Sequence, residues 1–75
     1  IKGLRKFTMQ YSLLEVVQLQ QDFPNRSLCR GSPGTIVDTY MAPHEAYEVE
    51  FCDDRGVTIA LLTLRPEQLR SISNL

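Results

Sequence analysis

Apolar residues in this chain recur at every second position, which is the spacing of a β-strand and not of a helix. The clearest segment, residues 46–52, alternates large apolar residues with polar ones, in the order Tyr47, Glu48, Val49, Glu50, Phe51 and Cys52. Such alternation predicts a strand with one face in a core and the other in water. A chain with this period buries its apolar residues by pairing strands, so we expect an all-β fold.

Other segments show the same period or are rich in β-branched residues, which favour strands. We therefore expect five strands, at residues 14–19, 35–40, 46–52, 57–64 and 69–72. The best candidate for a long helix, residues 11–21, contains the β-branched pair Val16 and Val17 and ends at no convincing cap. We predict no long helix.

The connections between these strands carry turn signals. A long polar loop follows the first strand over residues 20–33, and its apolar residues Phe23 and Leu28 are expected to fold back onto the core. Residues 53–56 predict a tight hairpin. Pro66 stands where a short 3-10 turn would begin, directly before the last strand.

These elements together predict a small SH3-like five-stranded barrel, with a long loop after the first strand and a short 3-10 turn before the last. The nearest alternative is a five-stranded meander that does not fully close. With 75 residues and a mass of 8.6 kDa, the chain has room for one core. We assign residues 9–75 to this single domain.

The first eight residues differ in charge from the rest of the chain. Residues 1–8 contain three basic residues and no acid, whereas residues 9–75 contain five basic and nine acidic residues. We interpret residues 1–8 as a basic N-terminal tail, a leader or a vector-derived remnant, with a nucleic-acid-binding arm as the alternative. No segment has the ~20 apolar residues that a membrane span needs, and none predicts a secretory signal.

Few residues point to catalysis or to a metal. Cys29 and Cys52 stand 23 positions apart without a Cys-x-x-Cys pair, and we expect two free thiols in a reducing cytoplasm. His44 is the only histidine, so neither a zinc site nor a cysteine–histidine nucleophile is expected. Glu48 and Glu50 lie on the outward face of a strand, where solvation explains them. We therefore expect no enzyme activity, no metal and no cofactor.

A family resemblance rests on an ordered set of short motifs. They are Val-Val-Gln-Leu at 16–19, Asp-Phe-Pro at 22–24, Gly-Thr-Ile-Val at 34–37, Tyr-Glu-Val-Glu-Phe at 47–51 and Leu-Thr-Leu at 62–64. Over residues 13–72 the chain resembles a family of small bacterial proteins known only as a domain of unknown function. Residues 30–37 are more distantly similar to the glycine turn of KOW-type barrels and of the nitrile hydratase β chain. The resemblance implies the barrel and a bacterial, cytoplasmic setting, and it brings no catalytic residues.

The predicted fourth strand, residues 57–64, is apolar on both faces, although a barrel has only one inside. Its second face needs an apolar cover, either the long loop or another copy of the chain, and the sequence leaves both open. Oligomerisation often stabilises a core this small, and aromatic residues favour interfaces. We therefore expect a non-catalytic interaction or assembly module that forms a homo-oligomer and binds a protein encoded by a neighbouring gene. The residues assigned to the interface are Tyr40, Tyr47, Ala60, Leu62 and Leu64.

A KOW-like RNA-binding module is the alternative function. It would require a basic patch formed by four arginines of the long loop and the chain end, Arg26, Arg30, Arg65 and Arg70. Residues 38–54 contain six acids and no lysine or arginine, which disfavours contact with phosphates. A protein partner is therefore preferred to a nucleic acid.

Overall fold

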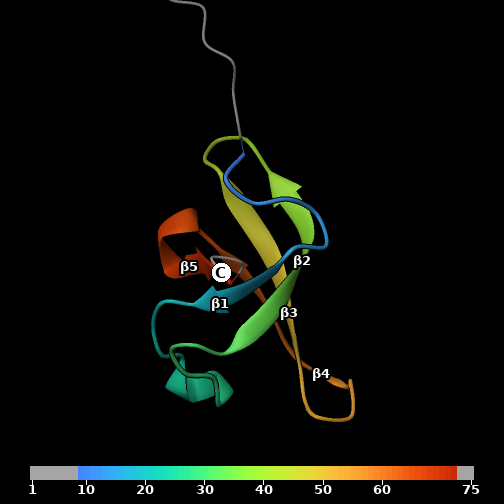
Figure 1. Ribbon diagram of the computed structural model, residues 1–75. Coiled ribbons are helices and arrows are strands. Elements are labelled where there is room, and N and C mark those ends of the chain that lie inside the picture. The colour runs from blue at the N-terminus through green and yellow to red at the C-terminus, as the bar shows by residue number, and fades with distance from the viewer. Residues whose placement is uncertain (1–8, 73–75) are drawn as a thin grey trace, which may run out of the picture.

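The computed structural model describes residues 9–72, so the predicted basic tail at 1–8 lies outside the described residues. The strands of one antiparallel sheet (Figure 1) are β1 (Val16–Leu19), β2 (Pro33–Tyr40), β3 (Ala46–Cys52), β4 (Thr58–Leu64) and β5 (Leu69–Ser71). The 3-10 turns are η1 (Pro24–Arg26), in the loop after β1, and η2 (Pro66–Gln68), directly before β5. The predicted all-β class, the five strands, the long loop and the turn before the last strand are confirmed.

The strand order across the sheet is β4-β3-β2-β1-β5, and each neighbouring pair is antiparallel. β5 lies on the far side of β1, where its residues pair with Val17, Gln18 and Leu19. Among the described residues no ladder joins β5 to β4, so hydrogen bonds do not close the sheet into a barrel. The closure expected from the sequence is therefore not observed, because β5 is only three residues long and forms its ladder with β1.

The core lies on one face of the sheet, and β3 supplies its centre. Tyr47, Val49 and Phe51 expose at most 1% of their surface, while the intervening Glu48 and Glu50 stay partly exposed. This is the arrangement that the alternation in the sequence predicted. β1 and β2 add three fully buried residues, which are Val17, Leu19 and Ile36.

Two shifts in strand register make the sheet irregular. One lies in the β2–β3 ladder between Ile36 and Asp38, and the other in the β3–β4 ladder between Phe51 and Cys52. An extra residue at such a position bends the strand and increases the local twist. In Figure 1 the β3–β4 hairpin extends beyond the other strands, so its outer strand, β4, is uncovered along the hairpin.

Gly34 marks a close approach of β2 to β3. The residue is buried, and a Cβ atom built on it would lie 2.7 Å from both Phe51 Cε1 and Val49 Cγ1. A strand glycine of this kind is required where another segment approaches closely. At Gly34, packing of β3 against β2 therefore depends on the missing side chain.

The loop between β1 and β2 closes part of the core. Leu28 is buried and Phe23 packs against the core cluster, as the sequence predicted for both residues. A pair of backbone hydrogen bonds joins them, from Phe23 N–H to the Leu28 carbonyl (2.8 Å) and from Leu28 N–H to the Phe23 carbonyl (3.2 Å). The η1 turn lies between the two residues, so the loop has a defined shape of its own.

Candidate functional site

β4 and the residue directly before it carry a row of exposed apolar side chains. Val57, Ile59 and Leu61 leave 57%, 48% and 51% of their surface exposed, respectively. Single exposed apolar residues are common, but several on one strand are not explained by chance. We call Val57, Ile59 and Leu61 the β4 row.

The edge of β4 that faces away from β3 has no partner strand in the described part of the chain. A free sheet edge presents backbone N–H and C=O groups that another strand can pair with. In β4 this edge coincides with the β4 row, so backbone hydrogen bonding and apolar contact are available at the same place.

Two glutamates of β3 stand beside β4 on the outward face, and β4 threonines hold both of them. Thr63 Oγ1 donates to Glu48 Oε1 at 2.6 Å, and Thr58 Oγ1 donates to Glu50 Oε2. These contacts keep the carboxylates over β3 and leave the far edge of β4 without charge. Acid–base chemistry would need a substrate pocket beside them.

A depression on the same face is too small for such a substrate. It has a volume of about 190 Å³ and is lined by residues of β1, β2 and β3, namely Val16, Pro33, Gly34, Thr35, Glu50 and Cys52. Small-molecule sites usually have volumes of about 300–1,000 Å³. Strand pairing aligns Leu61 with Glu50, Glu50 with Thr35, and Thr35 with Val16, so the lining of this depression lies one to three strands away from β4.

The residues assigned to an interface from the sequence lie mostly on the inward face. Tyr47, Ala60 and Leu64 are buried in the core, and Leu62 is half-buried and packs against it. Tyr40 is exposed at the end of β2, with 39% of its surface accessible. A partner that docks on the folded domain reaches Tyr40 but not the three buried residues.

The choice between the two faces of β4 was not decided by its sequence, because both are apolar. The structure places Ala60, Leu62 and Leu64 inward and leaves the β4 row exposed. The loop residues Phe23 and Leu28 belong to the core cluster, and the β4 row remains half exposed. Among the described residues, therefore, the loop does not cover this row.

A tyrosine network that the sequence analysis missed connects the segment before β1 to β3. The rings of Tyr11 and Tyr47 meet edge to face, with centroids 5.4 Å apart and an interplanar angle of 73°. Tyr11 N–H donates to Tyr47 Oη at 3.1 Å, and the Tyr47 hydroxyl donates to Glu45. The same Glu45 oxygen accepts from Gln10 N–H at 3.0 Å, and the Tyr11 hydroxyl donates to the Leu69 carbonyl at 3.3 Å.

Burial is the main cause that raises the pKa of both phenols. For Tyr47 the hydrogen bond to Glu45 and the charge of that carboxylate raise the pKa further. For Tyr11 the hydrogen bond with Gln10 opposes the effect of burial, while nearby Glu15 and Glu45 add to it. Neither tyrosine lines the depression described above, and the network attaches the segment before β1 to the core.

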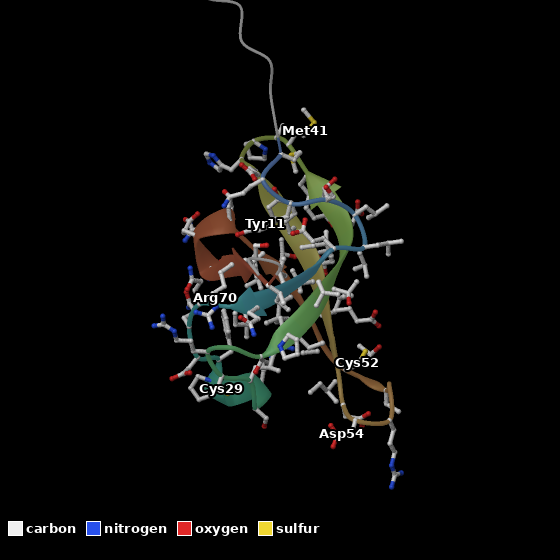
Figure 2. All side chains as sticks on the ribbon, in the orientation of Figure 1. Tyr11, Cys29, Met41, Cys52, Asp54 and Arg70 are labelled. Atoms are coloured by element: carbon white, nitrogen blue, oxygen red, sulfur yellow. The ribbon has the colours of Figure 1, made fainter. Side chains whose placement is uncertain are left out.

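The remaining candidates for chemistry stand apart from one another. Cys29 and Cys52 are both free and exposed, one in the loop after β1 and the other at the end of β3 (Figure 2). In the part of the chain that the structure describes, no three His, Cys, Asp or Glu side chains are placed to hold a metal ion. Within the same residues no helix combines the length and apolar character that crossing a membrane requires.

Two of the four arginines considered for RNA binding have protein partners at the chain end. Arg65 Nε lies 3.3 Å from Glu67 Oε2, an exposed ion pair that contributes little stability. Arg70 Nε donates to Gln18 Oε1 at 2.9 Å across the β1–β5 ladder. The backbone N–H of Arg30 donates to Asp22 Oδ1 at 2.8 Å, which places a carboxylate next to this arginine in the loop.

Comparison with known proteins identifies the family of the chain. No curated protein and no solved structure matches it. No link to SH3-like barrels, to KOW-type barrels or to the nitrile hydratase β chain is found. The sequence profile described as Domain of unknown function (DUF4926) matches residues 13–71, which cover all five strands, and the chain therefore belongs to this family.

Proposed function

We propose that this domain is a non-catalytic protein-interaction module that self-associates, built on an SH3-like arrangement of five strands. The observation that carries the proposal is the β4 row, three half-exposed apolar side chains along the free edge of the sheet. Tyr40 and Met41, which are exposed at the turn after β2, provide further apolar surface for a second protein.

The expected gain from covering the β4 row supports a weak association. Complete burial of a Val, Leu or Ile side chain is worth about 1.5–3 kcal/mol, so covering the exposed half contributes about 1 kcal/mol per residue. Two copies supply six such side chains, or about 6 kcal/mol before any backbone hydrogen bonds. Association costs about 4–15 kcal/mol in lost freedom of motion. At the lowest cost the apolar contact leaves about 2 kcal/mol, so backbone hydrogen bonds along the edge must supply the remainder. We therefore expect a weak complex, with a dissociation constant in the high micromolar range or above.

The arrangement of polar groups supports a non-catalytic role. Glu48 and Glu50 accept hydrogen bonds from threonines, and the depression beside Glu50 lacks the volume of a usual substrate site. The exposed free thiols of Cys29 and Cys52 fit a reducing, cytoplasmic setting, which is part of the proposal.

Sedimentation velocity over a range from about 5 μM to about 1 mM tests self-association, because this range brackets a micromolar dissociation constant. The proposal predicts that the weight-average mass rises with concentration above the monomer mass of 8.6 kDa. A mass that stays at the monomer value throughout would contradict self-association. Salt-sensitive binding of RNA by the same preparation would instead favour the alternative, a KOW-like RNA-binding module.

A further inference from the structure

We infer that a second copy of the chain adds at the free edge of β4, antiparallel to the β4 of the first copy, so that the two sheets become continuous. This inference rests on the proposed self-association and specifies where and how it occurs. Three observations support it. The two edges of the sheet differ in length and charge, β4 can pair with a second β4 in a defined register, and β4 itself carries no acidic residue.

The two free edges of the sheet differ in how well they are protected. β5 is three residues long and carries Arg70 at its centre, and short, charged strands resist pairing with another chain. β4 is seven residues long and contains neither a charged residue nor a proline. Its one protecting feature is the register shift near the hairpin, opposite Phe51 and Cys52. Of the two edges, β4 is therefore the one that can accept a strand.

Complete overlap of two antiparallel copies of β4 defines one register. The middle residue of Thr58–Leu64 is Leu61, so the two-fold axis passes beside Leu61 and places it opposite Leu61 of the second copy. In this register Ile59 faces Thr63 of the second copy, and Ala60 faces Leu62. Between Ile59 and Thr63, outward residues meet outward residues and inward residues meet inward ones, as the pleat of a sheet requires. Thr58 lies beyond the register shift and outside this match.

The distribution of charge favours this edge over the rest of the outward face. Residues 9–75 carry a formal net charge of −4, so two copies repel each other wherever their acids approach. Residues 56–64 contain no charge, and Glu48 and Glu50 are held on β3 by Thr63 and Thr58. Pairing through β4 therefore keeps Glu48 and Glu50 of each copy one strand away from the contact.

The first test replaces one residue of the β4 row with a charged residue of similar length. In Leu61→Lys the two new ammonium groups face each other across the axis, and like charges directly opposite destabilise a strand pair. We expect the dissociation constant to rise at least about tenfold in sedimentation experiments. The matched control is Leu13→Lys, because Leu13 is similarly exposed (58%) but lies outside the strands, and its association should equal that of the wild type.

The second test fixes the register by disulfide trapping, with the native thiols removed by Cys29→Ser and Cys52→Ser. Opposed residues of paired strands have Cβ atoms about 4.5–5.5 Å apart, close to what a disulfide spans. We expect Leu61→Cys to form a covalent dimer on mild oxidation. Ile59→Cys and Thr63→Cys should cross-link with each other when mixed, and more slowly when each is oxidised alone.

The outcomes separate the inference from the proposed function. If the wild type associates but Leu61→Lys associates equally well and no β4 cysteine cross-links, pairing at the β4 edge is wrong and self-association stands. If the wild type stays monomeric, the proposed self-association fails and the inference fails with it. Far-UV circular dichroism of each variant checks that the strands are retained, and the trapping experiment decides the matter if Leu61→Lys loses its fold.

Discussion

The close approach at Gly34 leads to a quantitative prediction about the stability of the domain. The change Gly34→Ala adds one methyl group, which would lie 2.7 Å from Phe51 Cε1, 2.7 Å from Val49 Cγ1 and 2.9 Å from Phe51 Cδ1. Both neighbours are core side chains that expose at most 1% of their surface, so neither moves without disturbing others. Overpacking of a well-packed core costs about 1–3 kcal/mol, and two simultaneous contacts place this variant near the upper value.

That loss is large for a domain of this size. At about 0.05–0.15 kcal/mol per residue, a chain of 75 residues has a free energy of unfolding of about 4–11 kcal/mol. Urea unfolding monitored by circular dichroism should show a lower midpoint concentration of urea, with an unchanged slope of the free energy of unfolding against urea concentration. A free energy of unfolding within about 0.5 kcal/mol of the wild-type value, the usual range for surface substitutions, would refute the steric argument.

A double-mutant cycle tests the cause directly. Val49→Ala removes Cγ1, one of the three atoms that the new methyl group would meet, so Gly34→Ala should cost less in that background than in the wild type. The matched control is Gly56→Ala in the β3–β4 turn, where a Cβ meets nothing within 4 Å but the backbone has φ of 81°. Its cost of about 1–2 kcal/mol reflects backbone strain and should not depend on Val49.

Three further outcomes are expected. Tyr47→Phe removes the acceptor of the buried Tyr11 N–H and the donor to Glu45. It should lower the free energy of unfolding, measured by urea titration, by about 1–3 kcal/mol. An unchanged free energy of unfolding would contradict the network. The pKa values of Tyr11 and Tyr47 are raised in the folded chain, so above about pH 10 the folded chain binds more protons than the unfolded chain. The free energy of unfolding should therefore fall as the pH rises through the raised pKa values. Tyr47→Phe should make this alkaline decrease less steep. Both thiols, Cys29 and Cys52, should react with Ellman's reagent in the native protein without denaturant, and a protected thiol would contradict their exposure.

The sequence predicted the fold most accurately in strands whose large apolar residues all lie on one face. In β3 each apolar residue alternates with a polar one, so the period alone determines which face is buried. In β4 both faces are apolar, and the inward one is selected by the register with β3, which pairs Leu62 with Val49 and Leu64 with Tyr47. A register between two strands is a tertiary property that the pattern of one strand does not contain.

The site and the closure of the sheet depended on contacts between distant residues. Tyr11 and Tyr47 are 36 positions apart, and their contact requires the chain before β1 to cross the end of β3. Tyr11 stands in no motif, and the motif that begins at Tyr47 indicates a strand and not a partner, so only a general tendency of buried phenols to find partners could have indicated the pair. The predicted barrel likewise required β5 to meet β4, whereas the three residues of β5 form a ladder with β1.

The unequal edges of the sheet also set a limit on growth. A chain with two unprotected edges can add a neighbour on each side, and repeated addition produces an open fibril. This domain has one long apolar edge, while its other edge is short and carries Arg70. If two copies pair through β4, as we propose, the pairing uses the same edge of both copies, and the assembly would terminate at a dimer. In that arrangement the three-residue β5, which supplies Leu69 to the core, would also act as a stop against polymerisation.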